Sequence, residues 1–276
     1  MRRPLVPRCA TLLPLLLLPL LLPLAAAAEE LPAAPPVAGA PATRESTVEL
    51  TAADGVLLKG VLAVPDVPGT EGRRWPVAIL IHDHKRSRDS LLDLCDALAA
   101  AGVASVRMDQ RGFGQSTATA DKSFYVFPIV PEAHLRRAVG DQKLLLEWLR
   151  QDPAIDATRL AVVGVGHGAL TAAEFAGRGS AVKALVAVDP VEAVAGFRPE
   201  QDLATYDRRP ALIVCSAFPQ SRARAARWAE YGLGPRVVHC DESFDSRDRL
   251  LRAGADVTNE IATWVARELA PPASAP

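Results

Sequence analysis

The residues with the clearest chemical potential lie in one glycine-rich stretch, VVGVGHGAL at 162–170. An apolar run leads into Gly164, and glycine then recurs at Gly166 and Gly168, which predicts a tight turn from a strand into a helix. Chemistry at such a turn uses either the side chain at its centre or the backbone N–H groups of the new helix, which bind anions. Gly166 brings no side chain to the centre, whereas His167 brings an imidazole ring.

The same glycines also admit a cofactor-binding interpretation. GVGHGA at 164–169 fits the G-x-G-x-x-G/A pattern, in which the pyrophosphate of a dinucleotide rests on the helix N-terminus. Asp189 ends the next apolar run, where an acid would bind a ribose hydroxyl. The unit lies in the middle of the chain, however, and too little sequence follows it for a second nucleotide-binding half. Dinucleotide binding is kept as an alternative, and we predict no bound cofactor.

Apolar periodicity predicts the elements that must position these residues. Residues 47–65 alternate apolar and polar side chains around Asp54-Gly55, which predicts a β-hairpin. Short apolar runs predict strands at 75–82, 104–109, 159–164, 183–189, 210–216 and 235–240. Amphipathic or helix-spaced stretches predict helices at 90–102, 132–152, 169–178, 221–232 and 257–270. A hairpin followed by strand–helix units predicts an α/β fold with a mostly parallel sheet, helices on both faces and no large lid.

This order of elements resembles the α/β-hydrolase fold over residues 46–270. DQRGFGQS at 109–116 is similar to a D-x-R-G-x-G-x-S segment found in many of these proteins. DPAIDATRLAVVG at 152–164 resembles the lead-in to the nucleophile strand of dienelactone-hydrolase-like and serine-aminopeptidase-like members. LIHDH at 80–84 falls where the family often carries His-Gly, and RPALIVCS at 209–216 is similar to the strand before the catalytic acid. The resemblance implies a hydrolase of ester-type bonds.

The resemblance also shows what is missing at the nucleophile and acid positions. The family's G-x-S-x-G elbow reads Gly164 to Gly168 here, so Gly166 takes the nucleophile position, keeps the turn and removes the oxygen. His167 is the nearest substitute nucleophile. The acid should follow 210–216, but residues 217–221 hold no carboxylate. Asp189 is the alternative acid, or a turn residue ahead of a proline.

The base position departs from the family pattern as well. The catalytic histidine is expected within DESFDS at 241–246, where Phe244 stands nearest to its place. His239 precedes that place, inside the expected strand, and is interpreted either as a base or as a packed strand residue. Because a triad needs a nucleophile, a base and an orienting acid in hydrogen-bond contact, the resemblance implies a degenerate site.

Other members of the expected cleft come from residues 80–84, since this strand ends beside the elbow in the family. The backbone N–H groups of Asp83 and His167 are the expected oxyanion hole, and His82 and His84 are expected to line the cleft. His-x-His on an extended segment places both rings on one side, as in many metal sites. A metal site of His82, His84 and His167 is therefore an alternative to a cleft that holds no metal.

Composition limits the partners and the compartment. Residues 1–28 combine arginines with a Leu/Pro-rich run and end in small residues, the layout of a Sec-type signal peptide, so we expect a secreted or periplasmic protein. Residues 29–45 read as a Pro/Ala-rich linker and 271–276 as a disordered tail. Losing the three arginines of the signal takes the net charge from −1 to −4, which does not favour nucleic acid. Membrane contact is expected only with an uncleaved signal.

Three cysteines follow the expected signal, at Cys95, Cys215 and Cys240. An odd number does not form a disulfide framework. Cys95 is expected to be a buried side chain on a helix. Cys215 and Cys240 each close a predicted strand, so they either form a bridge or remain free, depending on a Cα distance that the sequence does not give.

Two classes of function remain open on these residues. The first is a pseudo-hydrolase that uses the cleft, or the surface around it, to bind a small molecule or a protein partner. The second is a residual hydrolase of ester or acyl substrates that uses His167, Asp189 or the backbone donors, because positioned donors accelerate a reaction without a nucleophile. The fold alone does not choose between them.

Overall fold

The computed structural model of the chain describes residues 42–84, 86–121, 123, 131–179, 181–194, 196–241 and 256–271. The expected signal peptide and most of the expected linker lie outside these residues. So do Phe244 and nearly all of the segment around it.

Eight strands form one sheet in the order β1-β2-β4-β3-β5-β6-β7-β8. Their bounds are β1 Thr43–Thr51, β2 Leu57–Pro65, β3 Trp75–Ile81, β4 Ala104–Met108, β5 Ile155–Val165, β6 Val182–Val188, β7 Ala211–Ser216 and β8 Arg236–Asp241. β1 pairs with β2 and β2 with β4 in antiparallel register, whereas β3 to β8 pair in parallel. The predicted mostly parallel sheet with an N-terminal hairpin is confirmed.

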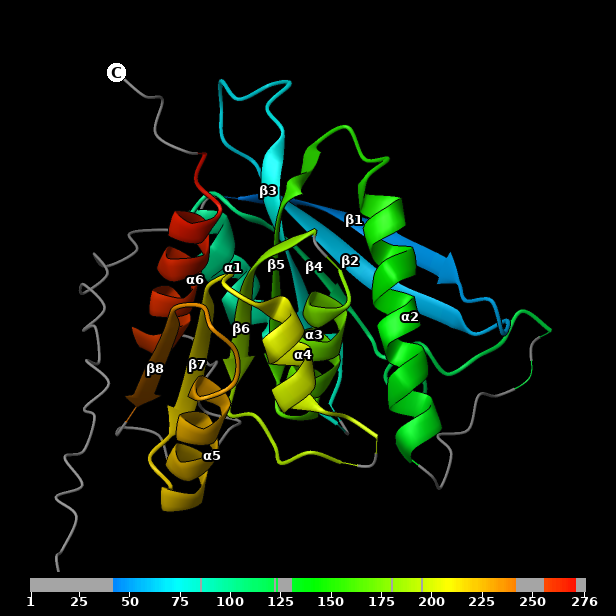
Figure 1. Cartoon of the computed structure of the whole chain (residues 1–276). Helices are drawn as coiled ribbons and strands as arrows, with labels where there is room; N and C mark the ends of the chain where they lie inside the picture. Colours follow the sequence, from blue (N-terminus) through cyan, green and yellow to red (C-terminus); the bar gives the residue numbers. More distant parts are fainter. Residues whose placement is uncertain are drawn as a thin grey trace, which may run out of the picture.

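The helices cover both faces of the sheet (Figure 1). Their bounds are α1 Leu92–Ala100, α2 Pro131–Leu149, α3 His167–Gly177, α4 Pro199–Tyr206, α5 Pro219–Ala229 and α6 Asp256–Glu268. Buried residues of α1 and α6 share one hydrophobic cluster, and buried residues of α2, α3, α4 and α5 share the other. Two helical layers therefore enclose the sheet, as predicted.

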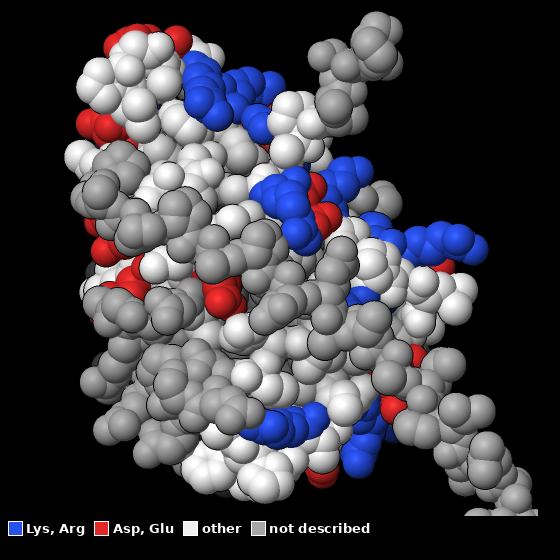
Figure 2. Space-filling view, turned by 90° about the vertical axis from the view of Figure 1, so that its left-hand side faces the viewer, with Lys and Arg blue, Asp and Glu red and all other residues white. Residues whose placement is uncertain are grey.

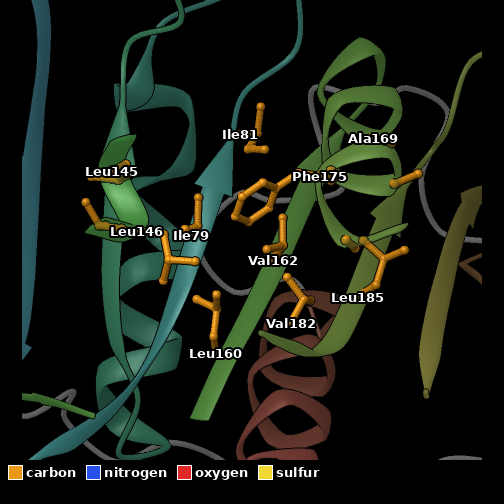
Figure 3. Packing of buried hydrophobic residues seen from close by; sticks show 14 of the residues in the cluster. Ile79, Ile81, Leu145, Leu146, Leu160, Val162, Ala169, Phe175, Val182 and Leu185 are labelled. Carbon is orange, nitrogen blue, oxygen red and sulfur yellow. The ribbon is translucent and has the colours of Figure 1, made fainter. Parts of the chain in front are cut away.

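Strand β5 shows how the sequence divides between these two layers. Leu160 and Val162 belong to the cluster under α2 and α3, whereas Ala161, Val163 and Val165 belong to the cluster under α1 and α6. Successive side chains of a strand point to opposite faces, so a strand buried on both sides needs a continuous apolar run. Figure 3 shows Leu160 and Val162 in the first cluster, on the side from which α3 contributes Phe175. This packing fixes where β5 ends and the glycine turn begins.

Two elements differ from the sequence prediction. β1 begins at Thr43, inside the stretch expected to be linker, and exposes most of its side chains. Helix α4 lies in a region predicted to be loop; Pro199 starts it, and Leu203 and Tyr206 are buried. Proline suits the first turn of a helix because its missing N–H has no partner there. With two apolar anchors along eight residues, α4 has too little periodicity to be recognised in the sequence.

On the face drawn in Figure 2, Lys and Arg side chains form separate groups with Asp and Glu among them. An open groove of about 1110 Å³ lies at the amino ends of β5, β6 and β7, and Lys183, Arg208 and Leu269 are among the residues that line it. This groove is at the end of the sheet opposite the glycine turn. No helix in the described part of the chain is long and apolar enough to cross a membrane.

Candidate functional site

The turn after β5 is made by one residue. β5 ends at Val165 and α3 begins at His167, so Gly166 alone redirects the chain. Its φ of 57° and ψ of −116° lie in a region that side chains rarely adopt. The Gly166 N–H donates to the carbonyl of Val188 at 2.9 Å, which ties the turn to the end of β6. The backbone is that of a strained elbow, and no side chain stands at its centre.

The flanking glycines allow α3 to start in contact with the sheet. A Cβ added to Gly164 would lie 2.4 Å from the carbonyl oxygen of Gly168. A Cβ added to Gly168 would lie 2.4 Å from the carbonyl oxygen of Ile81 on β3. Because backbone atoms do not move aside easily, both positions require glycine. The N-terminus of α3 is thereby held beside the end of β3.

One carboxylate oxygen fills the space between these two strand ends. Asp83 Oδ1 accepts the backbone N–H of His84 at 2.8 Å and the backbone N–H of His167 at 2.8 Å. It also lies 3.0 Å from Nδ1 of the His167 ring. The Asp83 side chain is 16% exposed and that of His167 is 31% exposed. Three nitrogen atoms therefore surround a single oxygen at the edge of the protein.

The two backbone donors lie where the family pattern places an oxyanion hole. In α/β-hydrolases the hole uses the N–H of the residue after the nucleophile and an N–H from the loop after the third strand. The N–H of His167 has the position of the first of these donors. The N–H that accompanies it belongs to His84 rather than to Asp83, and Asp83 contributes the acceptor. The sequence analysis missed the direction of the Asp83 side chain. The signal that could have suggested it is that aspartate often accepts a hydrogen bond from a nearby backbone N–H.

His82 is a structural residue at the end of β3. It is fully buried, and its Nδ1 lies 2.7 Å from the carbonyl oxygen of Asp83 while its Nε2 accepts the N–H of Gln110 at 2.8 Å. Burial lowers the pKa of His82 and favours the neutral ring that this bonding pattern requires. Both ring nitrogens of His82 bond the backbone, so neither is available to bind a metal ion or another ligand.

Three rings gather above the elbow, and one of them was not foreseen. The ring centroids of His84 and His167 lie 5.3 Å apart, and those of His84 and Phe113 lie 5.2 Å apart. Edge-to-face contact at this spacing is favourable for aromatic rings. Phe113 belongs to the segment 109–116. It stands at a variable position of the D-x-R-G-x-G-x-S pattern, so the sequence analysis assigned it no role. His84, His167 and Phe113 are thus brought together with Asp83.

The segment that carries Phe113 is held by a buried ion pair. Asp109 accepts the backbone N–H of Arg88 at 2.8 Å, the Arg88 guanidinium at 2.5 Å and the N–H of Gln115 at 2.9 Å. A Cβ on Gly114 would lie 2.3 Å from the Asp109 carboxyl. Arg111 bonds Asp141 of α2 through two nitrogens. These residues of the D-x-R-G-x-G-x-S pattern have structural roles.

Asp189, the alternative acid, is bound at the end of β6. Its φ is 42°, and its carboxylate accepts a hydrogen bond from the Ser221 hydroxyl. Arg224 lies 3.6 Å from the same oxygen, and Ser221 in turn accepts the N–H of Ser216 at 3.2 Å. Asp189 therefore links the ends of β6 and β7 to α5, which agrees with the turn interpretation.

His239, the remaining candidate base, faces the other helical layer. Its Nε2 lies 3.2 Å from Glu260 on α6, whereas the elbow belongs to α3 on the opposite face. Phe244 lies outside the described residues. The sequence itself holds five histidines, and none follows His239. His167, paired with Asp83, is the histidine that the structure places at the elbow.

The ends of β7 and β8 are joined covalently. Cys215 and Cys240 are directly opposite in register, with Cα atoms 4.6 Å apart, and form a disulfide. Cys95 is free and buried, as expected. The bridge fixes the two strands after which a hydrolase of this fold carries its acid and its base.

The alternative ligands find little support in this geometry. No group of three His, Cys, Asp or Glu suited to a metal ion occurs among the described residues. For a dinucleotide, the N–H of His167 at the start of α3 is already bonded by Asp83, and Asp189 is bonded by Ser221. The two groups that a pyrophosphate and a ribose would need are therefore engaged within the chain.

Comparison with known proteins places this geometry in a family. The sequence model of the serine aminopeptidase family, S33, matches residues 76–226, more than half of the chain. An α/β-hydrolase from Penicillium sp. sh18 superposes with a TM-score of 0.67 at 15% identity, over 82% of this chain and 99% of the other. A dienelactone hydrolase from Anabaena variabilis gives 0.61 at 16% identity, over 82% and 96% of the two chains. An esterase from Pyrobaculum calidifontis gives 0.59 at 17% identity, over 81% and 85%. No curated protein matches the chain.

Proposed function

The chain belongs to the serine aminopeptidase family of the α/β-hydrolase fold, and from this premise we propose that it is a pseudo-hydrolase. In this proposal the cleft at the elbow binds a small molecule or a protein partner and does not cleave it. The observation that carries the proposal is Gly166: the backbone has the strained conformation of a nucleophile elbow, and the residue that adopts it has no side chain. Acyl transfer through a covalent intermediate needs a nucleophilic atom at this point.

The state of the other catalytic positions supports the same proposal. Asp189 is bonded by Ser221, and His239 pairs with Glu260 on the opposite face of the sheet. The oxygen of Asp83 occupies the donors that would stabilise a tetrahedral oxyanion, and a carboxylate there repels negative charge. The proposed loss of function therefore extends from the nucleophile to the groups that would assist it.

The test is ester hydrolysis by the wild-type domain and by Gly166→Ser, with p-nitrophenyl acetate and butyrate as substrates. Gly166→Ala is the matched control, since it introduces the same backbone strain without an oxygen. We expect none of the three proteins to exceed a heat-denatured sample. Turnover by the wild type that is lost in His167→Ala would overturn the proposal.

A residual hydrolase is the second candidate, and the contact between Asp83 and His167 favours it. A carboxylate 3.0 Å from Nδ1 orients an imidazole as a general base, so His167 would remove a proton from water that attacks the ester directly. No acyl-enzyme forms on this route. Steady turnover without a burst phase, reduced at least about a hundredfold in His167→Ala, is its expected signature.

Export is part of the proposal. The arginines and apolar run of residues 1–28 support a signal peptide, and the disulfide between Cys215 and Cys240 supports an oxidising compartment. Expression of the full chain in a Gram-negative bacterium, followed by fractionation, tests it. We expect a shortened protein in the periplasm; full-length protein in the cytosol with free thiols would contradict export.

A further inference from the structure

We propose that the groove at the amino ends of β5, β6 and β7 is a binding site for an organic phosphate, a ligand that carries a phosphate group on an apolar body. In this proposal Lys183 and Arg208 bind the phosphate, and residues 269–271 contact the apolar body. The groove lies at the end of the sheet opposite the elbow, so the inference goes beyond the proposed function and does not depend on it.

The groove has the size of a small-molecule site. Its volume of about 1110 Å³ is slightly larger than the roughly 300–1,000 Å³ that sites for organic ligands occupy. An adjoining hollow of about 400 Å³ shares Thr158 and Lys183 with the groove and is also lined by Arg150. Lys183 therefore stands where the two hollows meet.

One wall of the groove is held in place by Arg209. Its Nη1 donates to the carbonyl oxygens of Gly179 and Val182 at 2.7 and 2.9 Å. Its Nη2 donates to Ala176 at 3.1 Å and its Nε to Tyr206 at 2.9 Å, and the guanidinium lies 4.1 Å from the centroid of the Tyr206 ring. These contacts join α3, β6 and α4 at the groove. A ligand therefore meets a wall that is already ordered, which lowers the cost of binding.

Two carboxylates in the lining are already paired within the chain. Asp156 accepts from Nε of Arg159 at 2.7 Å, and Glu268 lies 2.8 Å from Nη2 of Arg267. Because each of these acids has its own cation, neither leaves uncompensated negative charge in the groove.

Two cations in the lining have no acidic partner in the part of the chain that the structure describes. Lys183 is an exposed residue of β6, and Arg208 is an exposed residue shortly before β7. Arg150 in the adjoining hollow is also exposed and lacks such a partner. The remaining carboxylate, Asp207, acts on Arg236: burial lowers the pKa of Arg236, and the charge of Asp207 is among those that raise it. The groove therefore holds an excess of positive charge.

This set of groups fits a phosphate ester. A guanidinium donates to two phosphate oxygens at once, and an ammonium adds a compact charge. A phosphomonoester carries about 1.5 to 2 negative charges at neutral pH, which matches two cations. Leu269, Ala270, Pro271 and Pro210 line the same groove and provide apolar surface beside these cations. The combination selects a phosphate that is joined to an apolar body over a phosphate ion alone.

Phenyl phosphate is the probe, and calorimetry at about pH 8, where the phosphate is a dianion, measures its affinity. We expect Lys183→Gln and Arg208→Gln each to weaken binding at least about fivefold, because each removes one charge-assisted hydrogen bond. Lys143→Gln, at an exposed position of α2 outside the groove, should bind like the wild type. Inorganic phosphate should bind the wild type more weakly than phenyl phosphate, since it makes no contact with residues 269–271.

Four results would overturn the inference. They are no measurable binding of phenyl phosphate by the wild type, equal affinity in the wild type and both groove variants, an equal loss in Lys143→Gln, and inorganic phosphate binding as tightly as phenyl phosphate. The third result would show that only the net charge of the protein matters. All three substitutions lie away from the elbow, so the titration and the esterase assay fail independently.

A shortened chain that ends at Pro271 tests the one competing occupant within the protein. Residues 272–276 follow directly on Pro271, which lines the groove. Unchanged affinity for phenyl phosphate in the shortened chain is the expected result and supports an external ligand. Binding at least about tenfold tighter would identify residues 272–276 as the occupant and overturn the inference.

Discussion

The loop after β4 and the turn after β5 follow the two strands that flank β3 in the sheet, and they differ in which side chains of the family pattern they carry. In the loop, Asp109, Arg111 and Gly114 of the D-x-R-G-x-G-x-S pattern are present, and each has an identified contact. In the turn, Gly164 and Gly168 keep contacts that no larger residue would fit, while Gly166 has no reactive group. The residues that shape the backbone are in place, and glycine stands at the centre of the turn, where the family pattern has its nucleophile.

This difference teaches that a fold match and an activity match rest on different residues. The packing contacts of Gly164 and Gly168 are needed for the chain to fold, whether or not the protein catalyses a reaction. A nucleophile contributes nothing to packing, and glycine at its position even relieves backbone strain. A protein of this family is therefore recognised as a hydrolase by its scaffold whether or not it catalyses a reaction.

Removing the buried ion pair that holds the loop after β4 should have the largest effect on stability. Asp109→Ala leaves the Arg88 guanidinium without its buried partner, and the side chain of Arg88 is only 12% exposed. Loss of one member of a buried ion pair costs about 3–5 kcal/mol of unfolding free energy. Chemical denaturation followed by circular dichroism measures this cost.

The control for that prediction uses the same arginine. Asp89 lies 3.9 Å from Arg88 with a side chain 67% exposed, and exposed pairs contribute less than about 1 kcal/mol. Asp89→Ala should therefore unfold at nearly the wild-type denaturant concentration. Similar losses in both variants would show that burial of the pair does not decide the stability of the loop.

The disulfide extends the comparison to the ends of β7 and β8. It closes a loop of 25 residues, which corresponds to about 3.5 kcal/mol in the chain-entropy account. Cys215→Ala with Cys240→Ala should lower the unfolding free energy by that amount, and a reducing agent should destabilise the wild type but not this double variant. Cys95→Ala should respond to the reducing agent as the wild type does. A wild type that is insensitive to reduction would contradict a structural role for the bridge.

The glycine that contacts β3 sharpens the comparison within the turn itself. Gly168→Ala forces a Cβ to within 2.4 Å of the Ile81 carbonyl oxygen, and we expect a loss of about 2–3 kcal/mol from the resulting overpacking. Gly140→Ala is the matched control. No atom lies within 4 Å of the added Cβ there, and alanine in a helix interior stabilises by about 0.5–1 kcal/mol. Thermal unfolding should shift in opposite directions for the two variants.

The sequence was sufficient for the elements that bury continuous apolar runs and insufficient for those that do not. The stretch from Val162 to Ala169 predicted the end of strand β5 and the start of helix α3, because the packing of both elements requires apolar residues and glycines there. Helix α4 was missed because Leu203 and Tyr206 are its main buried anchors. The role of Asp83 was missed for a different reason: its position was evident, but the direction of a side chain depends on N–H groups that only the folded α3 supplies. A site made by backbone groups that are distant in the sequence is hard to predict, because nearly every residue type supplies a backbone N–H.

Asp202 on α4 gives the smallest expected effect and the one with a defined pH window. Burial, reinforced by the nearby charge of Glu174, raises its pKa to about 6. In the unfolded chain the carboxyl of Asp202 ionises near pH 4. The folded state resists this ionisation, so the stability of the protein falls as the pH rises from about 4 to about 6 and stays lower above that range. Asp202→Asn removes this penalty and should stabilise the protein by about 1–2 kcal/mol at pH 7, since the carboxyl is only partly buried. Asp96→Asn, at an exposed position on α1, corrects for the loss of one charge. If Asp202→Asn and the wild type keep the same difference in stability at pH 4 and pH 7, α4 does not hold Asp202 in the environment described.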